Sequence, residues 1–280
     1  MGLVSSYLKC FVAGMTFLGS FQCNLLYLPD YPNGSREYVQ NPSDYGIQRY
    51  EDVVLTTQDK VKIRIYVLPQ VHKAPTILTF HGNAGNVGNC IPIAKRFYND
   101  FKCNVVMLSY RGYGRSEGTP TETGLKIDAQ TALNYICNHS ILKHTKIILY
   151  GQSLGGAVAI DLASKNGDKV AGLIVENTFL SIPKVLPHVI PQLRHLTLLC
   201  TQKWESEKAI KHIKNMPILF LSGIEDELIP KEHMKRLYDF VEGSRKELRE
   251  FPKGNHGNTV AQPGYFDSIW EFLVKERFIV

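Results

Sequence analysis

Five short and almost wholly apolar segments recur along the chain, and segments with helical character separate most of them. They occupy residues 76–80, 104–110, 146–150, 171–176 and 217–223. A run of this length without a polar side has no face to turn toward water, so both of its faces must be buried. Strands of that kind occur in parallel sheets that helices cover on both sides, and this requirement limits the chain to few architectures.

A hairpin and a final strand extend the pattern at its two ends. Apolar residues alternate along residues 51–57 and 61–69, on either side of a polar turn, and residues 246–252 form a later, more polar run. Such alternation is typical of paired, half-buried strands. Helical segments are expected at residues 88–100, 123–138, 154–166, 231–241 and 267–275. We therefore expect an α/β fold with a mostly parallel central sheet and helices on both faces.

The sequence GQSLGG directly follows the third apolar run and places Ser153 between a strand and a helix. A sharp strand-to-helix turn holds a nucleophile in strained backbone geometry, and Gly151, Gly155 and Gly156 leave room for that turn. The start of the helix also favours negative charge above the serine. Serine is common in ordinary tight turns, so the prediction of a nucleophile depends on partners elsewhere in the chain.

The sequence HGNAGN follows the run at residues 76–80 and should therefore lie at the same edge of the sheet as Ser153. A turn at this place presents backbone N–H groups to the nucleophile. We expect the N–H groups of Asn83 and Leu154 to form an oxyanion hole. His81 stands before the turn, and we expect it to hold the loop by hydrogen bonding rather than to transfer protons.

An acid and a histidine follow the serine in the order that a triad on an α/β-hydrolase sheet requires. Three adjacent acids, Glu225, Asp226 and Glu227, come after the fifth apolar run, and His256 stands about thirty positions later in a Gly/Asn-rich loop. One of the acids could instead cap the next helix. Asp226 is the favoured orienting acid, so the predicted triad is Ser153, Asp226 and His256.

The N-terminal part of the chain differs from the rest. Residues 11–28 contain no charged side chain, and eighteen helical residues span about 27 Å, close to the thickness of a bilayer core. We expect an anchor at residues 1–30, a linker at 31–46 and the hydrolase domain at 47–280. A cleaved signal peptide and a helix packed on the domain are alternatives, and the opening MGLVSS also fits a myristoylation pattern. The expected location is a membrane, with the endoplasmic reticulum or another endomembrane favoured.

Charge and cysteine content exclude several classes of protein. The chain carries 32 basic and 26 acidic residues, a net charge of +6, without a block of like charges, so a nucleic-acid partner is not expected. Its six cysteines are scattered, without a CxxC motif or close Cys/His pairs. Neither a zinc site nor a disulfide framework is predicted. The predicted chemistry requires no metal and no cofactor.

Residues 177–206 interrupt the alternation of strands and helices. Three prolines, at positions 183, 187 and 191, stand there among apolar residues. We interpret the segment as a small cap over the site. Its apolar side chains should line a pocket for a lipophilic acyl substrate, while its basic and histidine side chains face water or lipid headgroups.

Taken together, the segments HGNAGN, SYRGYGRSEG, GQSLGGA and LSGIEDELIP resemble the Bem-type serine hydrolases of the α/β-hydrolase superfamily. The resemblance extends from about residue 47 to residue 280. With the segment at residues 177–206, the expected architecture is an α/β-hydrolase fold with a small cap after the sixth strand. The resemblance also implies Ser153, Asp226 and His256 as the triad, and a short N-terminal membrane anchor.

The expected function is that of a membrane-associated serine hydrolase. It would cleave an acyl ester or thioester through an acyl-enzyme intermediate. Two alternatives stay open: a serine peptidase, and a non-catalytic scaffold that binds partners through a retained hydrolase fold. The sequence leaves the oligomeric state open.

Overall fold

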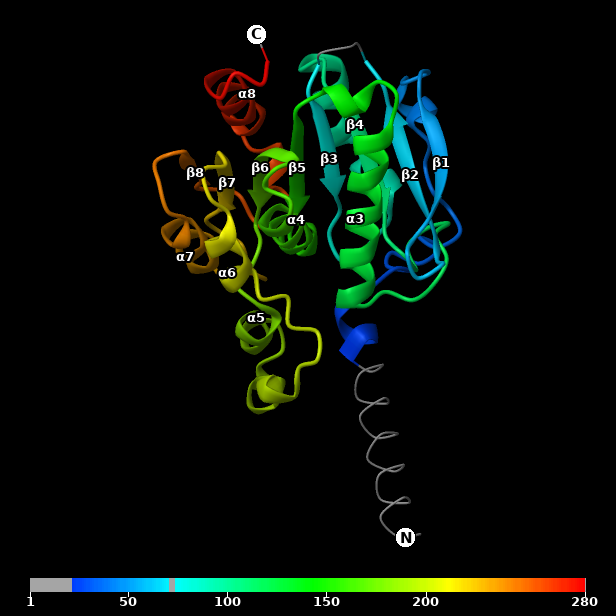
Figure 1. Ribbon diagram of the computed structural model, residues 1–280. Helices are drawn as coiled ribbons and strands as arrows, with labels where there is room; N and C mark the ends of the chain where they lie inside the picture. The colour runs from blue at the N-terminus through cyan, green and yellow to red at the C-terminus, as the bar shows by residue number, and fades with distance from the viewer. Residues whose placement is uncertain (1–21, 71–73, 280) are drawn as a thin grey trace, which may run out of the picture.

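Eight strands form one sheet in the order β1-β2-β4-β3-β5-β6-β7-β8 (Figure 1). The computed structural model describes residues 22–70 and 74–279. The strands are β1 (Glu51–Thr56), β2 (Lys62–Leu68), β3 (Thr76–Phe80), β4 (Asn104–Ser109), β5 (Ile147–Gln152), β6 (Val170–Glu176), β7 (Ile218–Gly223) and β8 (Lys246–Phe251). They agree with the eight runs expected from the sequence, and the predicted fold class is confirmed.

Burial along the strands follows from their places in the sheet. β1 pairs antiparallel with β2, and β2 pairs antiparallel with β4, while β3 to β8 run parallel. Every residue of β3, β4 and β7 is buried, whereas the edge strand β1 contains no buried residue. The wholly apolar runs are therefore the strands covered on both faces, as the sequence predicts.

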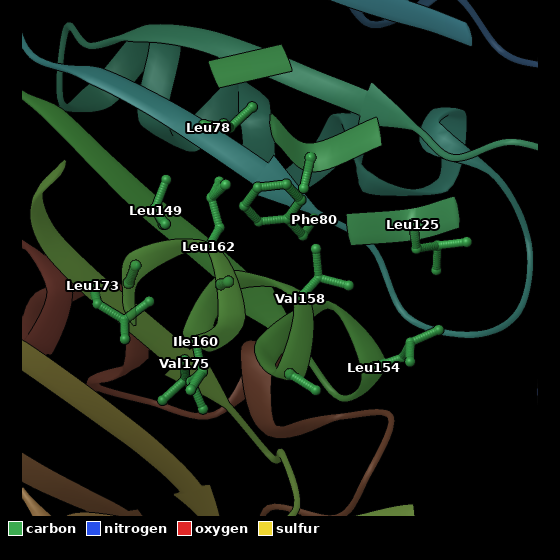
Figure 2. Close-up of a cluster of buried hydrophobic side chains, with 14 of the residues drawn as sticks. Leu78, Phe80, Leu125, Leu149, Leu154, Val158, Ile160, Leu162, Leu173 and Val175 are labelled. Carbon is green, nitrogen blue, oxygen red and sulfur yellow. The ribbon is translucent and has the colours of Figure 1, made fainter. Parts of the chain in front are cut away.

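Helices cover both faces of the sheet. The main ones are α2 (Ile91–Lys95), α3 (Glu122–Asn138), α4 (Leu154–Lys165), α5 (Ile182–Val189), α6 (Ser206–Ala209), α7 (Glu232–Phe240) and α8 (Tyr265–Lys275). Ile147 and Leu149 of β5 pack in one core with α3, α4 and α7, which Figure 2 shows in part. Ile148 and Tyr150 pack in the other core with α2 and α8. Neighbouring residues of one strand thus serve opposite cores.

The predicted cap lies at the carboxyl edge of the sheet (Figure 1). It consists of α5 and a 3-10 helical stretch, Pro191–Leu199. Pro183 is accommodated in the first turn of α5, where its missing N–H removes no intrahelical bond. Because the carboxyl ends of parallel strands meet at this edge, the cap covers the loops in which the candidate residues lie.

Residues 22–28 pack against the domain and the cap. Tyr27 is only 2% exposed. Its hydroxyl accepts a hydrogen bond from Trp204 Nε1 at 3.0 Å and donates one to Gln202 Oε1 at 3.1 Å. The greater part of the predicted anchor, residues 1–21, lies outside the described residues. Among those that are described, no helix is long and apolar enough to cross a bilayer.

Residues 31–46, which the sequence predicts to be an irregular linker, also contact the domain. Asn86 Nδ2 donates hydrogen bonds to the carbonyl oxygens of Ser35 and Tyr38, and Val39 is buried. A short 3-10 helix, Pro42–Tyr45, follows. The packed part of the chain therefore begins before residue 47, where the sequence predicts its start.

Candidate active site

Ser153 occupies the turn between β5 and α4. Its φ of 54° lies in the left-handed region, which costs energy for a residue with a side chain. Its N–H donates to the Glu176 carbonyl at 2.9 Å, which ties the turn to β6. A Cβ at Gly155 would collide with the Phe80 carbonyl oxygen, and one at Gly151 would collide with the Gly155 backbone. The close approach of strand and helix therefore requires both glycines.

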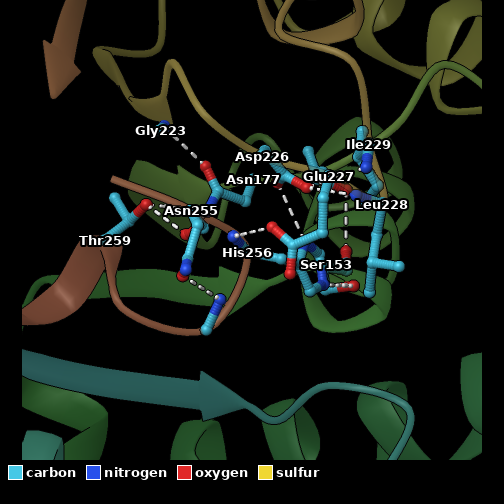
Figure 3. Close-up of polar contacts among 12 residues, drawn as sticks. Ser153, Asn177, Gly223, Asp226, Glu227, Leu228, Ile229, Asn255, His256 and Thr259 are labelled. Carbon is cyan, nitrogen blue, oxygen red and sulfur yellow. Dashed lines mark hydrogen bonds and ion pairs between the residues drawn. The ribbon is translucent and has the colours of Figure 1, made fainter. Parts of the chain in front are cut away.

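The structure brings the three predicted triad residues together from three separate loops (Figure 3). Ser153 Oγ lies 3.1 Å from His256 Nε2, and His256 Nδ1 lies 2.8 Å from Asp226 Oδ2. The Asp226 side chain is 1% exposed and that of His256 is 17% exposed. The acid is thus shielded from water while the imidazole remains accessible. Serine, base and orienting acid in this geometry can activate a hydroxyl for nucleophilic attack.

The three neighbouring acids differ in what they contact. Asp226 Oδ1 accepts the N–H groups of Leu228 at 2.9 Å and Ile229 at 2.8 Å, so one oxygen holds the loop while the other faces His256. Glu227 Oε2 accepts only the backbone N–H of His256, at 3.2 Å, among the described residues. Of the three, Asp226 alone contacts the imidazole. None of them caps the next helix, because α7 begins after Lys231 without a side-chain cap hydrogen bond.

Asn83 and Leu154, whose N–H groups are the predicted oxyanion donors, both line the pocket together with Ser153. Neither N–H has a hydrogen-bond partner within the described part of the chain, and Leu154 is the first residue of α4, where helix N–H groups lack intrahelical partners. The Asn83 carbonyl accepts from the Leu28 N–H and from the Tyr113 hydroxyl, which fixes the loop. Both N–H groups are therefore available to an oxyanion.

His81 is buried beside this loop. Its Nδ1 lies 2.8 Å from the Gly82 carbonyl oxygen, and its ring packs against Tyr110 and Tyr113 at centroid distances of 4.2 and 5.0 Å. Burial lowers the pKa of His81 to about 4, so the ring is neutral at physiological pH. These contacts are those of a residue that holds the loop, which is the role expected from the sequence.

Asn177 is a positioning residue that the sequence analysis did not identify. It lies directly after β6 with φ at 43° and is 1% exposed. Its Oδ1 accepts the Gly223 N–H at 2.8 Å, and its Nδ2 donates to Thr259 Oγ1 at 3.0 Å and to the Asn255 carbonyl at 3.2 Å. One side chain thus joins the ends of β6 and β7 to the loop of His256 (Figure 3). Its position as a polar residue after a buried strand was the available signal.

Glu176 is a second residue that sequence reasoning missed. Its carboxyl group is fully buried and accepts the hydroxyls of Tyr150 at 2.7 Å and Tyr265 at 2.5 Å, with Gln152 Nε2 at 3.2 Å. Burial raises the pKa of Glu176, against the opposing effect of its donors. The cluster joins β5, β6 and α8 directly behind the turn of Ser153.

A pocket of about 210 Å³ opens above Ser153 and His256. Nine of its twenty lining residues belong to the cap, from Ile182 to Cys200, and no Asp, Glu, Lys or Arg of the described chain lines it. Gln22, Leu25 and Leu26 form part of the wall as well, which the sequence did not predict. Among residues 22–70 and 74–279, no group of three or more His, Cys, Asp or Glu side chains is placed to hold a metal ion.

Known proteins with related sequences cover nearly the whole chain. Protein bem46 of Schizosaccharomyces pombe is 45% identical over 263 residues, which cover 92% of this chain and 88% of that protein. The uncharacterized membrane protein YNL320W of Saccharomyces cerevisiae is 41% identical over 279 residues, which cover 97% of this chain and 98% of that protein.

The family match and the structural comparison agree with these relatives. Residues 75–197 match the family described as alpha/beta hydrolase fold. The Pyrococcus furiosus esterase Pf2001 has a similar structure, with a TM-score of 0.73 and 19% identity, over 85% of this chain and 94% of that chain. At that identity the likeness concerns the fold alone, whereas the two yeast relatives establish descent. The chain therefore belongs to the Bem-type hydrolases of the α/β-hydrolase superfamily.

Proposed function

We propose that the protein is a serine hydrolase that cleaves a lipophilic acyl ester or thioester through an acyl-enzyme intermediate. The observation that carries this proposal is the continuous set of contacts from Asp226 through His256 to Ser153 at the floor of an apolar pocket. A binding scaffold has no physical need for this arrangement, which favours catalysis over that alternative.

In the first half-reaction, His256 Nε2 takes the proton of the Ser153 hydroxyl as Oγ attacks the carbonyl carbon of the substrate. The N–H groups of Asn83 and Leu154 stabilise the oxyanion of the tetrahedral intermediate, and Asp226 stabilises the imidazolium. The imidazolium then gives its proton to the departing alkoxide or thiolate, which leaves as an alcohol or thiol. In the second half-reaction, His256 activates a water that releases the acid and restores Ser153.

The pocket supports an uncharged, chain-like substrate. Its wall consists mainly of leucine, isoleucine and valine, without a formal charge that could pair with a polar acyl group. Each methylene transferred from water into such a wall contributes about 0.8 kcal/mol to binding. An acyl chain therefore fits the pocket better than a peptide does, because peptide groups would lose hydrogen bonds to water there.

We place the protein at a membrane, in the endoplasmic reticulum or another endomembrane, through the N-terminal apolar sequence. The uncharged run continues upstream of the packed residues 22–28, and the relative in Saccharomyces cerevisiae bears the name of a membrane protein. Replacing Phe17 and Leu18 with arginine should release the protein from membranes, because each charge costs about 2.5 to 3.5 kcal/mol in a bilayer centre. Fractionation after carbonate extraction measures this, and an unmutated chain that carbonate removes would contradict a spanning segment.

The test of the catalytic proposal is labelling by a fluorophosphonate probe, together with hydrolysis of acyl esters of graded chain length. The unmutated protein should be labelled and Ser153→Ala should not. Ser164→Ala is the matched control, because Ser164 lies in α4, the helix that follows Ser153, and its hydroxyl bonds only the Asp161 carbonyl among the described residues. Labelling or hydrolysis that persists in Ser153→Ala would exclude the mechanism.

A further inference from the structure

The mouth of the pocket is formed by exposed apolar side chains. All the pocket-lining residues that are also exposed are aliphatic: Leu25, Val189, Leu196, Leu199 and Leu228. Leu198 belongs to the same 3-10 stretch and is 94% exposed, but it lies outside the pocket lining. We call these six residues the apolar rim. The five lining residues among them border the opening of the pocket.

The apolar rim is a patch rather than scattered exposure. Twelve large apolar side chains are exposed in the described part of the chain, and six of them belong to the rim. Single exposed leucines are ordinary on soluble proteins, whereas a contiguous patch marks a surface that contacts something apolar. The 3-10 stretch Pro191–Leu199 contains no buried residue, so its leucines do not serve the core of the domain.

The charges around the rim identify the kind of partner. On the cap side of the rim, from Ile182 to Trp204, the chain contains Lys184, Arg194 and Lys203 but no Asp or Glu, whereas the exposed Glu225 and Glu227 precede Leu228. Lys184 pairs with Glu207, while Arg194 and Lys203 are exposed. Aliphatic side chains bordered by cations fit the boundary between anionic headgroups and acyl chains of a bilayer.

The N-terminal sequence meets the rim at the same face. Gln22 Nε2 donates to the Leu199 carbonyl at 2.8 Å, and Gln22 Oε1 accepts the Thr201 N–H at 2.7 Å. The described chain thus begins beside the rim (Figure 1), and the eleven residues before Gln22 carry no charge. A membrane attachment through that sequence would bring the rim to the lipid surface.

We propose that the apolar rim docks on an anionic bilayer surface, so that acyl substrates enter the pocket directly from the membrane. The entry of substrate rests on the proposed function, whereas the docking itself does not. Insertion of the rim places the pocket mouth among the acyl chains, and a lipophilic substrate then reaches Ser153 without crossing water.

The first test compares two substrates for the full-length protein in vesicles of phosphatidylcholine and phosphatidylserine. Leu198→Glu should lower hydrolysis of a long-chain ester embedded in the vesicles by about tenfold, the change expected when one leucine leaves an apolar phase. Hydrolysis of a water-soluble short-chain ester should stay unchanged, because Leu198 does not line the pocket. Val274→Glu is the matched control, since Val274 is 42% exposed on α8 at the opposite end of the molecule (Figure 1). Equal loss on both substrates, or no loss on either, would overturn the proposal.

The second test is independent of activity. In Leu198→Trp the added fluorescence, relative to the unmodified protein, should be quenched by brominated lipids, and in Val274→Trp it should not. Quenching at Leu198 supports docking even if no ester is hydrolysed, so failure of the proposed function is distinguishable from failure of the docking. Absence of quenching would overturn the proposal. A shift of the emission with protein concentration in the absence of vesicles would overturn it as well, in favour of contact between the rim and a second copy of the chain.

Discussion

Buried polar contacts hold the loops that carry Ser153, Asp226 and His256, whereas the cap has few such contacts and leaves apolar side chains in solvent. The single side chain of Asn177 joins the ends of two strands to the His256 loop. One Asp226 oxygen accepts loop N–H groups, and the other faces the imidazole. The cap stretch Pro191–Leu199 contains no buried residue. We infer that the sheet edge fixes the chemistry, while the cap determines what binds.

The largest effect is expected from the orienting acid. In Asp226→Asn the amide oxygen can still accept the loop N–H groups of Leu228 and Ile229, but the amide nitrogen would face His256 Nδ1 and favour the wrong tautomer. Turnover of a short-chain ester should fall about 10⁴-fold with an unchanged melting temperature. Glu227→Gln is the control, because Glu227 contacts only backbone of the histidine. A comparable loss of turnover in Glu227→Gln would assign the role of orienting acid to Glu227 instead of Asp226.

The next effect concerns Asn177. Asn177→Ala leaves the Gly223 N–H without its side-chain acceptor and removes one donor from the Asn255 carbonyl, which the Thr259 hydroxyl still reaches at 2.7 Å. We expect the free energy of unfolding to fall by about 3 kcal/mol and kcat by about tenfold, with KM for a short ester unchanged. Urea unfolding and steady-state kinetics measure both. Asn138→Ala, at the exposed end of α3, should leave both quantities unaffected. A changed KM would show that the loops also determine binding.

The free energy of unfolding should depend on pH through the buried His81 at the sheet edge but not through the exposed His195 of the cap. The pKa of buried His81 is about 4 in the folded chain, against 6.5 for an ordinary histidine. Between those values the unfolded chain binds the extra proton, so stability is lost as the pH falls, by about 2 kcal/mol at pH 5. His81→Gln should remove that part of the loss in urea unfolding at pH 7 and pH 5. His195→Gln, in the exposed cap, should leave the loss of stability between pH 7 and pH 5 unchanged. An equal change in both variants would show that the burial of His81 is not the cause of the pH dependence.

Much of the fold and of the candidate site could be predicted because burial on both faces leaves a local signature. β3, β4 and β7 are visible as apolar runs, and Ser153, Asp226 and His256 follow strands that end at one edge. The predicted bounds of the hairpin strands and of the helices α3, α4, α7 and α8 lie within two residues of the observed ones.

What the sequence could not predict depends on contacts between distant segments. Residues 22–28 are uncharged, and an uncharged segment of this composition could contact either lipid or the cap. The hydrogen bonds of Tyr27 with Trp204 and Gln202 show that it packs on the protein, and those partners are about 175 residues away in the sequence. Prolines made the cap look irregular, although α5 accommodates Pro183 and Pro187. The contacts of Asn177 could not be predicted because its three partners, Gly223, Asn255 and Thr259, lie far from it in the sequence.

The smallest effect is expected in the cap and tests the comparison directly. Val185 of α5 is buried and lines the pocket, so Val185→Phe fills space that the end of an acyl chain would occupy. Excluding one or two methylenes costs about 1 to 1.5 kcal/mol, which raises KM for a long-chain ester about tenfold and shifts the preferred chain length downward. The kcat for a short-chain ester should remain unchanged, as it should in Val274→Phe, the control at the far end of the molecule. Steady-state kinetics over a series of chain lengths provide the measurement. If Val185→Phe lowered kcat for the short ester as well, the cap would take part in arranging the catalytic groups, and the division between a chemical edge and a binding cap would fail.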